Sequence, residues 1–127
     1  MTAKDIMSTN VINVSRHTTI YDAVKIMVEA KISGLIITDD DQNVVGVVSE
    51  RDMMMAYDLL QEVKSTIEDF INFDVVSVSP DTEVGDVNKL LIQSNVKRVP
   101  VIENGKCLGV ISRGDILKYI FDHSSGV

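Results

Sequence analysis

One seven-residue pattern occurs twice in this chain and constrains its fold more than any other feature. Both stretches read glycine, two apolar residues, serine, two variable residues and aspartate, at Gly46–Asp52 and Gly109–Asp115. They lie 63 positions apart, and upstream residues such as Val14 and Val78 match at a spacing of 64. Such a repeat indicates two copies of one supersecondary unit that cannot bury its apolar face alone. We therefore expect copies in residues 1–62 and 63–127 that together form one globular module.

Apolar spacing predicts the same order of elements in each copy: strand, helix, strand, strand, helix. The segments of the first copy are 11–14, 20–31, 35–38, 44–48 and a helix from Asp52, and those of the second are 75–78, 84–92, 99–102, 107–111 and 113–122. The expected fold class is α/β (α+β), two β-α-β-β-α repeats packed through their sheets about a pseudo-twofold axis.

Composition narrows the class of protein. A chain of 127 residues can form a single substantial core. It contains neither an apolar run of about 20 residues nor a leader-like start, so we expect a cytoplasmic protein with no membrane partner. The net charge of −7, without a basic stripe, argues against nucleic acid as a partner. The single cysteine, Cys107, is expected to be a buried, inert thiol.

The Ser-x-x-Asp part of the repeated pattern has two interpretations. In the structural one, Ser49 and Ser112 cap a helix while Asp52 and Asp115 reach back to complete a capping box. In the functional one, the helix start attracts an anion and the carboxylate accepts bonds from vicinal hydroxyls. One side chain can serve both purposes, so both interpretations stay open.

Several other residues also have two interpretations. Lys97 and Arg98 are either a solvated pair or donors to a phosphate; Arg113, Arg51 and His17 are either surface residues or further phosphate contacts. Asp39, Asp41 and Asn43 have the alternate spacing of a calcium loop, but Val44 stands where the sharp-turn glycine is needed. A solvated hairpin tip is therefore expected there. No His/Cys cluster has zinc spacing and no hydrolase motif is present, so we expect no metal site and no catalytic residue.

Met53, Met54, Met55, Tyr57 and Leu59 exceed what one helical face can bury. They are either a core stripe with one exposed methionine or a helix–helix dimer surface, for which Ile116, Tyr119 and Ile120 are the equivalent patch in the second copy. We expect a homodimer.

From about Lys4 to His123 the sequence resembles the tandem CBS-domain family, named for cystathionine β-synthase. The resemblance is carried by the two patterns in register and by Lys97–Val101 ahead of the second. It implies two related clefts and an adenosine-containing ligand such as AMP, ADP, ATP or S-adenosylmethionine. By position, Asp115 would hold the ribose, and Ser112, Lys97, Arg98 and Arg113 the phosphate. The adenine would lie against Met7, Val11, Ile12, Ser33 and Gly34. The second cleft would use Asp52, Ser49 and Val76, but Ser33–Gly34 replace the basic pair there.

These features predict a regulatory module that is not an enzyme. It would bind an adenine nucleotide in the cleft between the repeats and relay occupancy, by a population shift, to an effector protein in trans. The alternative is an interaction or oligomerisation module with no nucleotide ligand.

Overall fold

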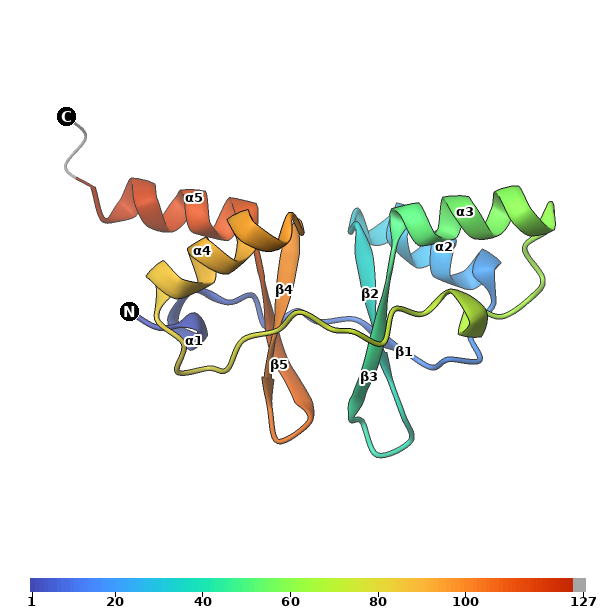
Figure 1. Ribbon diagram of the computed structural model, residues 1–127, viewed down its shortest axis with the longest axis horizontal. Helices are drawn as coiled ribbons and strands as arrows, with labels where there is room; N and C mark the ends of the chain where they lie inside the picture. The colour runs from blue at the N-terminus through green and yellow to red at the C-terminus, as the bar shows by residue number, and fades with distance from the viewer. Residues whose placement is uncertain (125–127) are drawn as a thin grey trace. The chain divides into compact units, whose positions relative to one another are not determined.

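The computed structural model describes residues 1–124 and has a mixed α/β fold, which confirms the predicted class (Figure 1). Its elements in chain order are α1 (Ala3–Ile6), β1 (Asn13–Val14), α2 (Ile20–Ala30), β2 (Gly34–Thr38), β3 (Val44–Ser49), α3 (Glu50–Leu60), the 3-10 helix η1 (Glu68–Phe70), α4 (Val84–Ser94), β4 (Arg98–Glu103), β5 (Lys106–Ser112) and α5 (Arg113–Asp122). The sequence also predicts fraying of residues 123–127, of which 125–127 lie outside the described residues.

The chain forms two compact units that do not coincide with the sequence repeats. Unit 2 is continuous and comprises Ile12–Val75, whereas unit 1 combines Met1–Val11 with the chain from Val76 onward. Within each unit, two long helices pack on the same side of an antiparallel hairpin: α2 and α3 beside β2–β3 in unit 2, and α4 and α5 beside β4–β5 in unit 1 (Figure 1).

Each unit has its own apolar core. In unit 2 the fully buried side chains include Ile20, Ile37 and Ile67, and in unit 1 they include Val99 and Ile111. Ile67 precedes η1 and belongs to the stretch after the first sequence repeat, so the core of unit 2 needs that stretch. Burial of large aliphatic side chains of this kind contributes roughly 1.5–3 kcal/mol each to the free energy of folding.

A short segment adds an edge pairing to the second strand of each hairpin. Ser8 and Val110 exchange backbone N–H···O bonds of 2.9 Å in both directions, and Asn72 and Val47 do the same at 2.9 and 3.0 Å. The adjacent motif glycines make this approach possible. A Cβ at Gly109 would lie 2.7 Å from the Ser8 carbonyl oxygen, and a Cβ at Gly46 would lie 2.8 Å from that of Asn72. These two positions therefore need glycine because backbone crosses directly over them.

The first strand of the repeat is shorter than predicted in unit 2 and reduced to one bridge in unit 1. β1 pairs in parallel with β2 at Asn13↔Ile36 and Val14↔Ile37, whereas the second copy has only Val78↔Val101. The missing bridge would pair Ser77 with Pro100, which has no N–H to donate. The strand predicted over residues 75–78 is therefore wrong for this physical reason.

Candidate functional site

Both copies of the repeated motif form complete capping boxes. At the start of α5, the Ser112 N–H and hydroxyl both donate to Asp115 Oδ2, at 2.8 and 3.0 Å, and the Asp115 N–H donates to Ser112 Oγ at 3.2 Å. At the start of α3, Ser49 and Asp52 make the same three bonds at 2.8, 3.0 and 3.2 Å. The structural interpretation of the motif is therefore confirmed. A cap of this kind stabilises its helix by about 1 kcal/mol.

The capping bonds leave part of each carboxylate available. All of the capping bonds to Asp115 and Asp52 end on Oδ2, so Oδ1 of each makes no hydrogen bond within the described part of the chain. A carboxylate oxygen accepts two hydrogen bonds, which suits a pair of neighbouring hydroxyls. The Ser112 hydroxyl, in contrast, already donates its proton to Asp115, so in this rotamer it has none to give to a phosphate.

The sheet register places Arg98 beside the motif of unit 1. Arg98 is the cross-strand partner of Ser112, and directly opposed residues project from the same face of an antiparallel pair with Cβ atoms about 5 Å apart. Arg98 Nε is buried and has no hydrogen-bond partner among the described residues. A buried guanidinium donor without an acceptor is unfavourable, so this nitrogen favours an anionic or polar ligand.

The predicted site residues divide between the two units. Unit 1 contains Met7, Val11, Val76, Lys97, Arg98, Ser112, Arg113 and Asp115, and unit 2 contains Ile12, Ser33, Gly34, Ser49 and Asp52. Within unit 1, the structure brings together Arg98, Ser112 and Asp115 through β4, β5 and α5, and Lys97 O accepts the Arg113 N–H at 3.1 Å. The Met7 side chain lies over Gly109, next to the Ser8–Val110 pairing. The roles of these residues toward a ligand stay predictions.

In unit 2 the register is the same but the chemistry differs. Gly34 is opposite Ser49, as Arg98 is opposite Ser112, and the Glu50 N–H donates to Ser33 O at 3.0 Å. The sequence alignment of Ser33–Gly34 with Lys97–Arg98 is therefore also the structural one. No basic side chain can project from Gly34, because the glycine has none.

A hollow of about 260 Å³ adjoins the motif of unit 2. Its lining residues are Asp52, Met55, Asp69, Phe70, Ile71 and Asn72. The sequence predicts a ligand role for Asp52 but not for Asp69 and Phe70 of η1 or for Ile71 and Asn72, which follow it. The signal was available, because Ile71 stands 64 positions after Met7, which was selected as an adenine contact in the other copy.

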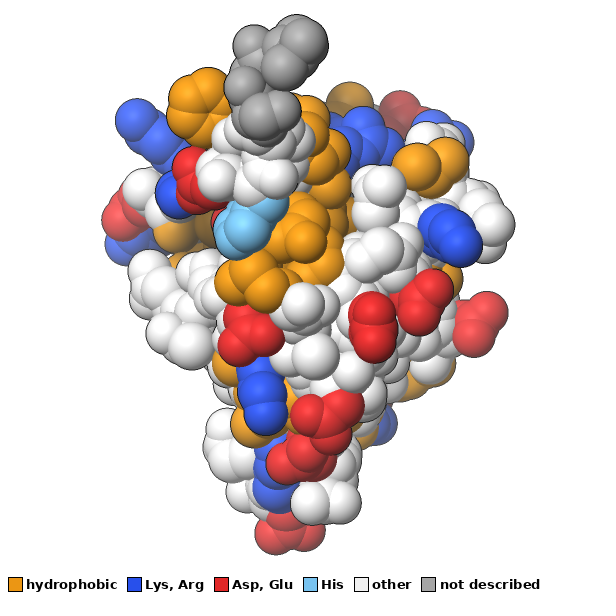
Figure 2. Space-filling view, turned by 90° about the vertical axis from the view of Figure 1, so that its left-hand side faces the viewer, with side chains coloured by type: hydrophobic (Ala, Val, Ile, Leu, Met, Phe, Trp, Pro, Cys, Tyr) orange, Lys and Arg blue, Asp and Glu red, His pale blue; other side chains and the backbone are white. Residues whose placement is uncertain are grey.

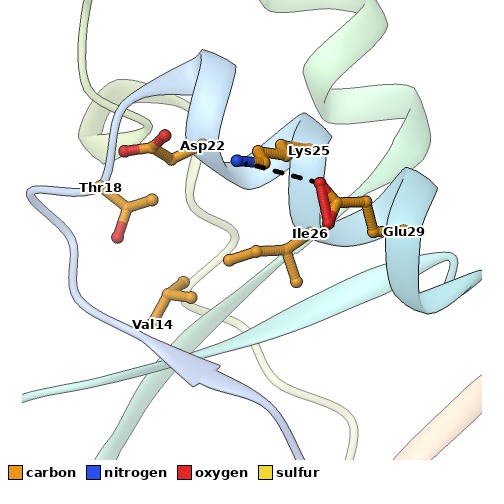
Figure 3. Close-up of a pocket in the computed structure, with 6 residues that line it drawn as sticks. All are labelled: Val14, Thr18, Asp22, Lys25, Ile26 and Glu29. Atoms are coloured by element: carbon orange, nitrogen blue, oxygen red, sulfur yellow. Dashed lines mark ion pairs between the residues drawn. The ribbon is translucent and has the colours of Figure 1, made fainter.

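A larger hollow of about 430 Å³ lies on the surface of α2 and shares no residue with either motif (Figure 3). Its lining residues are Val14, Thr18, Asp22, Lys25, Ile26 and Glu29. Lys25 and Glu29 form an ion pair of 3.9 Å across one helical turn. Both side chains are more than half exposed, so the pair is a solvated one that contributes little stability.

The remaining sequence candidates are surface features. Asp39 Oδ1 accepts the N–H groups of Asp41 and Asn43, both at 2.9 Å, which makes the acidic stretch a turn capped by its own carboxylate. Residues 1–124 contain no cluster of histidine, cysteine and acidic side chains that could hold a metal ion. His17 is exposed. No helix within those residues is long and apolar enough to cross a membrane.

The expected dimer patch needs a correction. Met53 and Ile116 are buried within their own units, with 3% and 5% of their surfaces exposed, because they occupy the inward faces of α3 and α5. Tyr119 is half-buried against the core of unit 1. The other expected residues, Met54, Met55, Tyr57 and Leu59 on α3 and Ile120 on α5, are exposed, and α5 adds Leu117 and Phe121.

Comparison with known proteins identifies the family. The model of the CBS domain matches residues 3–59 and 67–122, and the chain therefore belongs to the CBS domain family as a tandem pair. An uncharacterized 17.7 kDa protein of Acidianus ambivalens is 32% identical over 118 residues, covering 92% of this chain and 71% of that one. The chain spans less than half the length of several other relatives that it matches over more than nine-tenths of its own.

Two solved structures of the family carry ligands. CBSX2 in complex with AMP is 28% identical with a TM-score of 0.86, over 95% of this chain and 96% of that one. The CBS domain pair of protein MJ0100, in complex with 5′-methylthioadenosine and S-adenosyl-L-methionine, is 26% identical with a TM-score of 0.84, over 94% and 99% of the two chains.

Proposed function

We propose that this CBS domain pair is a regulatory module that binds an adenosine-containing ligand at its Ser-x-x-Asp motifs and is not an enzyme. The observation that carries the proposal is the unpartnered Nε of Arg98, a residue directly opposite Ser112, whose N–H donates to the Asp115 carboxylate. The complexes of CBSX2 with AMP and of MJ0100 with adenosine derivatives support the ligand class.

Each residue of unit 1 has a proposed role. Asp115 accepts the two ribose hydroxyls on Oδ1 while Oδ2 keeps the helix capped. Arg98 donates to the phosphate from the adjacent strand, and the exposed Lys97 and Arg113 add positive charge. Met7, held over Gly109, offers an apolar surface to the base. AMP, ADP and ATP all contain these groups.

Regulation follows if the ligand has different affinities for two conformations of the protein. A ligand that bridges α5 and β4 holds two elements of unit 1 in one arrangement, and a partner that binds only that arrangement would sense it. The proposed output is a change in the affinity with which a partner protein binds this chain.

The proposal is tested by mass spectrometry of ligand retained through purification, followed by titration calorimetry with AMP, ADP, ATP and S-adenosylmethionine. Arg98→Ala removes a charged donor and should weaken AMP binding roughly 10- to 100-fold. Lys118→Ala is the matched control, because Lys118 lies on α5 but pairs with Asp122 at 2.6 Å near the other end of the helix. Silence for all four compounds would refute the proposal.

A second candidate function is oligomerisation, favoured by exposed apolar residues at matching positions of α3 and α5. Met54 and Leu117 are 63 positions apart and have 72% and 66% of their surfaces exposed, and Tyr57 matches Ile120 in the same way. The face of unit 1 drawn in Figure 2 has hydrophobic side chains gathered on its upper part. We propose a homodimer through these helices. Sedimentation equilibrium of Leu117→Asp, with Lys118→Ala as the control, should show dissociation of the dimer.

A further inference from the structure

We infer that the two motifs select ligands of different charge: the pocket of unit 2 takes an adenosine derivative without a phosphate, neutral or cationic, while the motif of unit 1 takes the phosphorylated, anionic one. The inference rests on the proposed function and assigns a ligand class to each motif. It is carried by the pocket at Asp52 and by the charges at equivalent positions of the repeat.

The pocket of unit 2 combines acidic and apolar groups in one hollow. Asp52 contributes the carboxylate oxygen that its capping box leaves available, and Asp69 makes no hydrogen bond or ion pair within the described residues. Met55, Phe70 and Ile71 supply apolar and aromatic surface. Such a lining suits a purine nucleoside with an apolar or cationic 5′ substituent, because a thioether or a sulfonium is stabilised there and a phosphate is repelled.

The charges around the two motifs differ at several equivalent positions, and most of the differences make unit 1 the more basic. Lys97 and Arg98 in unit 1 correspond to Ser33 and Gly34 in unit 2. Arg113, the first residue of α5, corresponds to Glu50, the first residue of α3. Lys4 in α1 corresponds to Glu68 in η1. At one position the difference has the other sign, because Gly114 in unit 1 corresponds to the basic Arg51 in unit 2.

The pair of equivalent acidic residues, Asp5 and Asp69, strengthens the contrast. In unit 1, Asp5 Oδ2 accepts both the N–H and the hydroxyl of Thr2, at 2.8 and 3.1 Å, so this carboxylate caps α1. In unit 2, no side-chain hydrogen bond caps η1 within the described residues, and Asp69 lines the hollow. A dianionic phosphate next to Asp52, Asp69 and Glu50 would meet like charges, whereas next to Lys97, Arg98 and Arg113 it meets opposite ones.

Titration calorimetry of the full chain with three probes tests the inference: AMP, neutral 5′-methylthioadenosine and cationic S-adenosylmethionine. Asp52→Ala and Asp115→Ala are matched variants, since each removes the same capping bonds from its helix. Asp52→Ala should weaken the binding of 5′-methylthioadenosine at least 10-fold and that of AMP less than twofold. Asp115→Ala should weaken the binding of AMP at least 10-fold and that of 5′-methylthioadenosine less than twofold. Thermal unfolding checks that both variants fold. Both are expected to do so, because the loss of one N-cap destabilises only the start of its helix.

Asp69→Asn tests the charge itself, with Asp58→Asn, an exposed carboxylate of α3 outside the pocket, as its control. Asp69→Asn should weaken the binding of S-adenosylmethionine roughly 3- to 5-fold and leave the affinity for 5′-methylthioadenosine within twofold of the wild type. The inference is overturned if Asp52→Ala and Asp115→Ala lower the affinity for AMP equally, or if Asp69→Asn leaves the affinity for S-adenosylmethionine unchanged. A chain that binds AMP at both motifs overturns this inference alone; a chain that binds none of the three overturns the proposed function as well.

Discussion

The substitution Gly109→Ala tests how the amino-terminal segment is joined to the rest of unit 1. An added Cβ would lie 2.6 Å from Met7 Sδ and 2.7 Å from the Ser8 carbonyl oxygen. The methionine side chain can rotate away, but the carbonyl cannot, because it accepts the Val110 N–H at 2.9 Å. A carbon and an oxygen need about 3.3 Å, so the segment must move by roughly 0.6 Å.

This movement stretches both backbone bonds between Ser8 and Val110 beyond good geometry. Each bond contributes about 0.5–1.5 kcal/mol net, and overpacking a tight site costs about 1–3 kcal/mol. We expect Gly109→Ala to lower the free energy of unfolding by about 2–4 kcal/mol. Gly46→Ala, which faces the Asn72 carbonyl at 2.8 Å, should do the same to unit 2.

Urea denaturation followed by circular dichroism measures the loss, and hydrogen exchange of the Ser8 and Val110 amides locates it. The control is Gly85→Ala, on a helix position with no atom within 4 Å of the added Cβ. Alanine is the better helix former there, so this variant should gain about 0.5–1 kcal/mol. A Gly109→Ala protein within about 0.5 kcal/mol of the wild type, with unchanged amide protection, would refute the reasoning.

Three further predictions follow from the same contacts. Ser112→Ala should lower the free energy of unfolding by about 1 kcal/mol in urea denaturation, because the two hydrogen bonds of its hydroxyl, from the Asp115 N–H and to Asp115 Oδ2, disappear; an unchanged midpoint would contradict this. A fragment of residues 12–75 should give a cooperative thermal transition and one of residues 1–62 should not, since only the first contains Ile67 and Asn72; equal cooperativity would argue against the units. Burial raises the pKa of the Cys107 thiol, so its alkylation rate should rise at a higher pH in the folded protein than in the urea-unfolded chain. The free energy of unfolding should decrease as the pH rises through the pKa of the folded state, because the unfolded chain loses the thiol proton more readily. Coincident alkylation profiles in the two states would contradict this.

Much of the fold could be predicted because its signals are local. The Thr19 cap, which accepts the Asp22 N–H at 3.1 Å, and the helical spacing after it predict α2 within one residue. The serine of each motif marks the helix start, and the last helix has the predicted bounds of Arg113 and Asp122. These features depend on neighbours three or four residues apart, which a sequence displays directly.

The division of the chain into units depends on contacts that a repeat does not reveal. A repeat shows that Ala3–Ile6 and Ile67–Phe70 are equivalent, but it does not say against which hairpin each of them packs. Backbone bonds decide this: Ser8 pairs with Val110, and Asn72 pairs with Val47. The reduced strand at Val78 has a similar origin, since the deciding residue, Pro100, is distant in sequence.

The candidate site could be predicted only in part, for a reason of chemistry. Both motifs make the same three capping bonds, so the Ser-x-x-Asp pattern is fully explained by helix stability in either unit. What distinguishes the units is the residue opposite the serine, Arg98 in one and Gly34 in the other. A repeat can keep its folding signal in both copies while neighbouring positions diverge in charge, because the capping bonds involve only the serine and the aspartate and place no demand on the charges beside them. The ligand class must therefore be sought in the residues around the motif, since the motif itself is required by the helix whether or not a ligand binds.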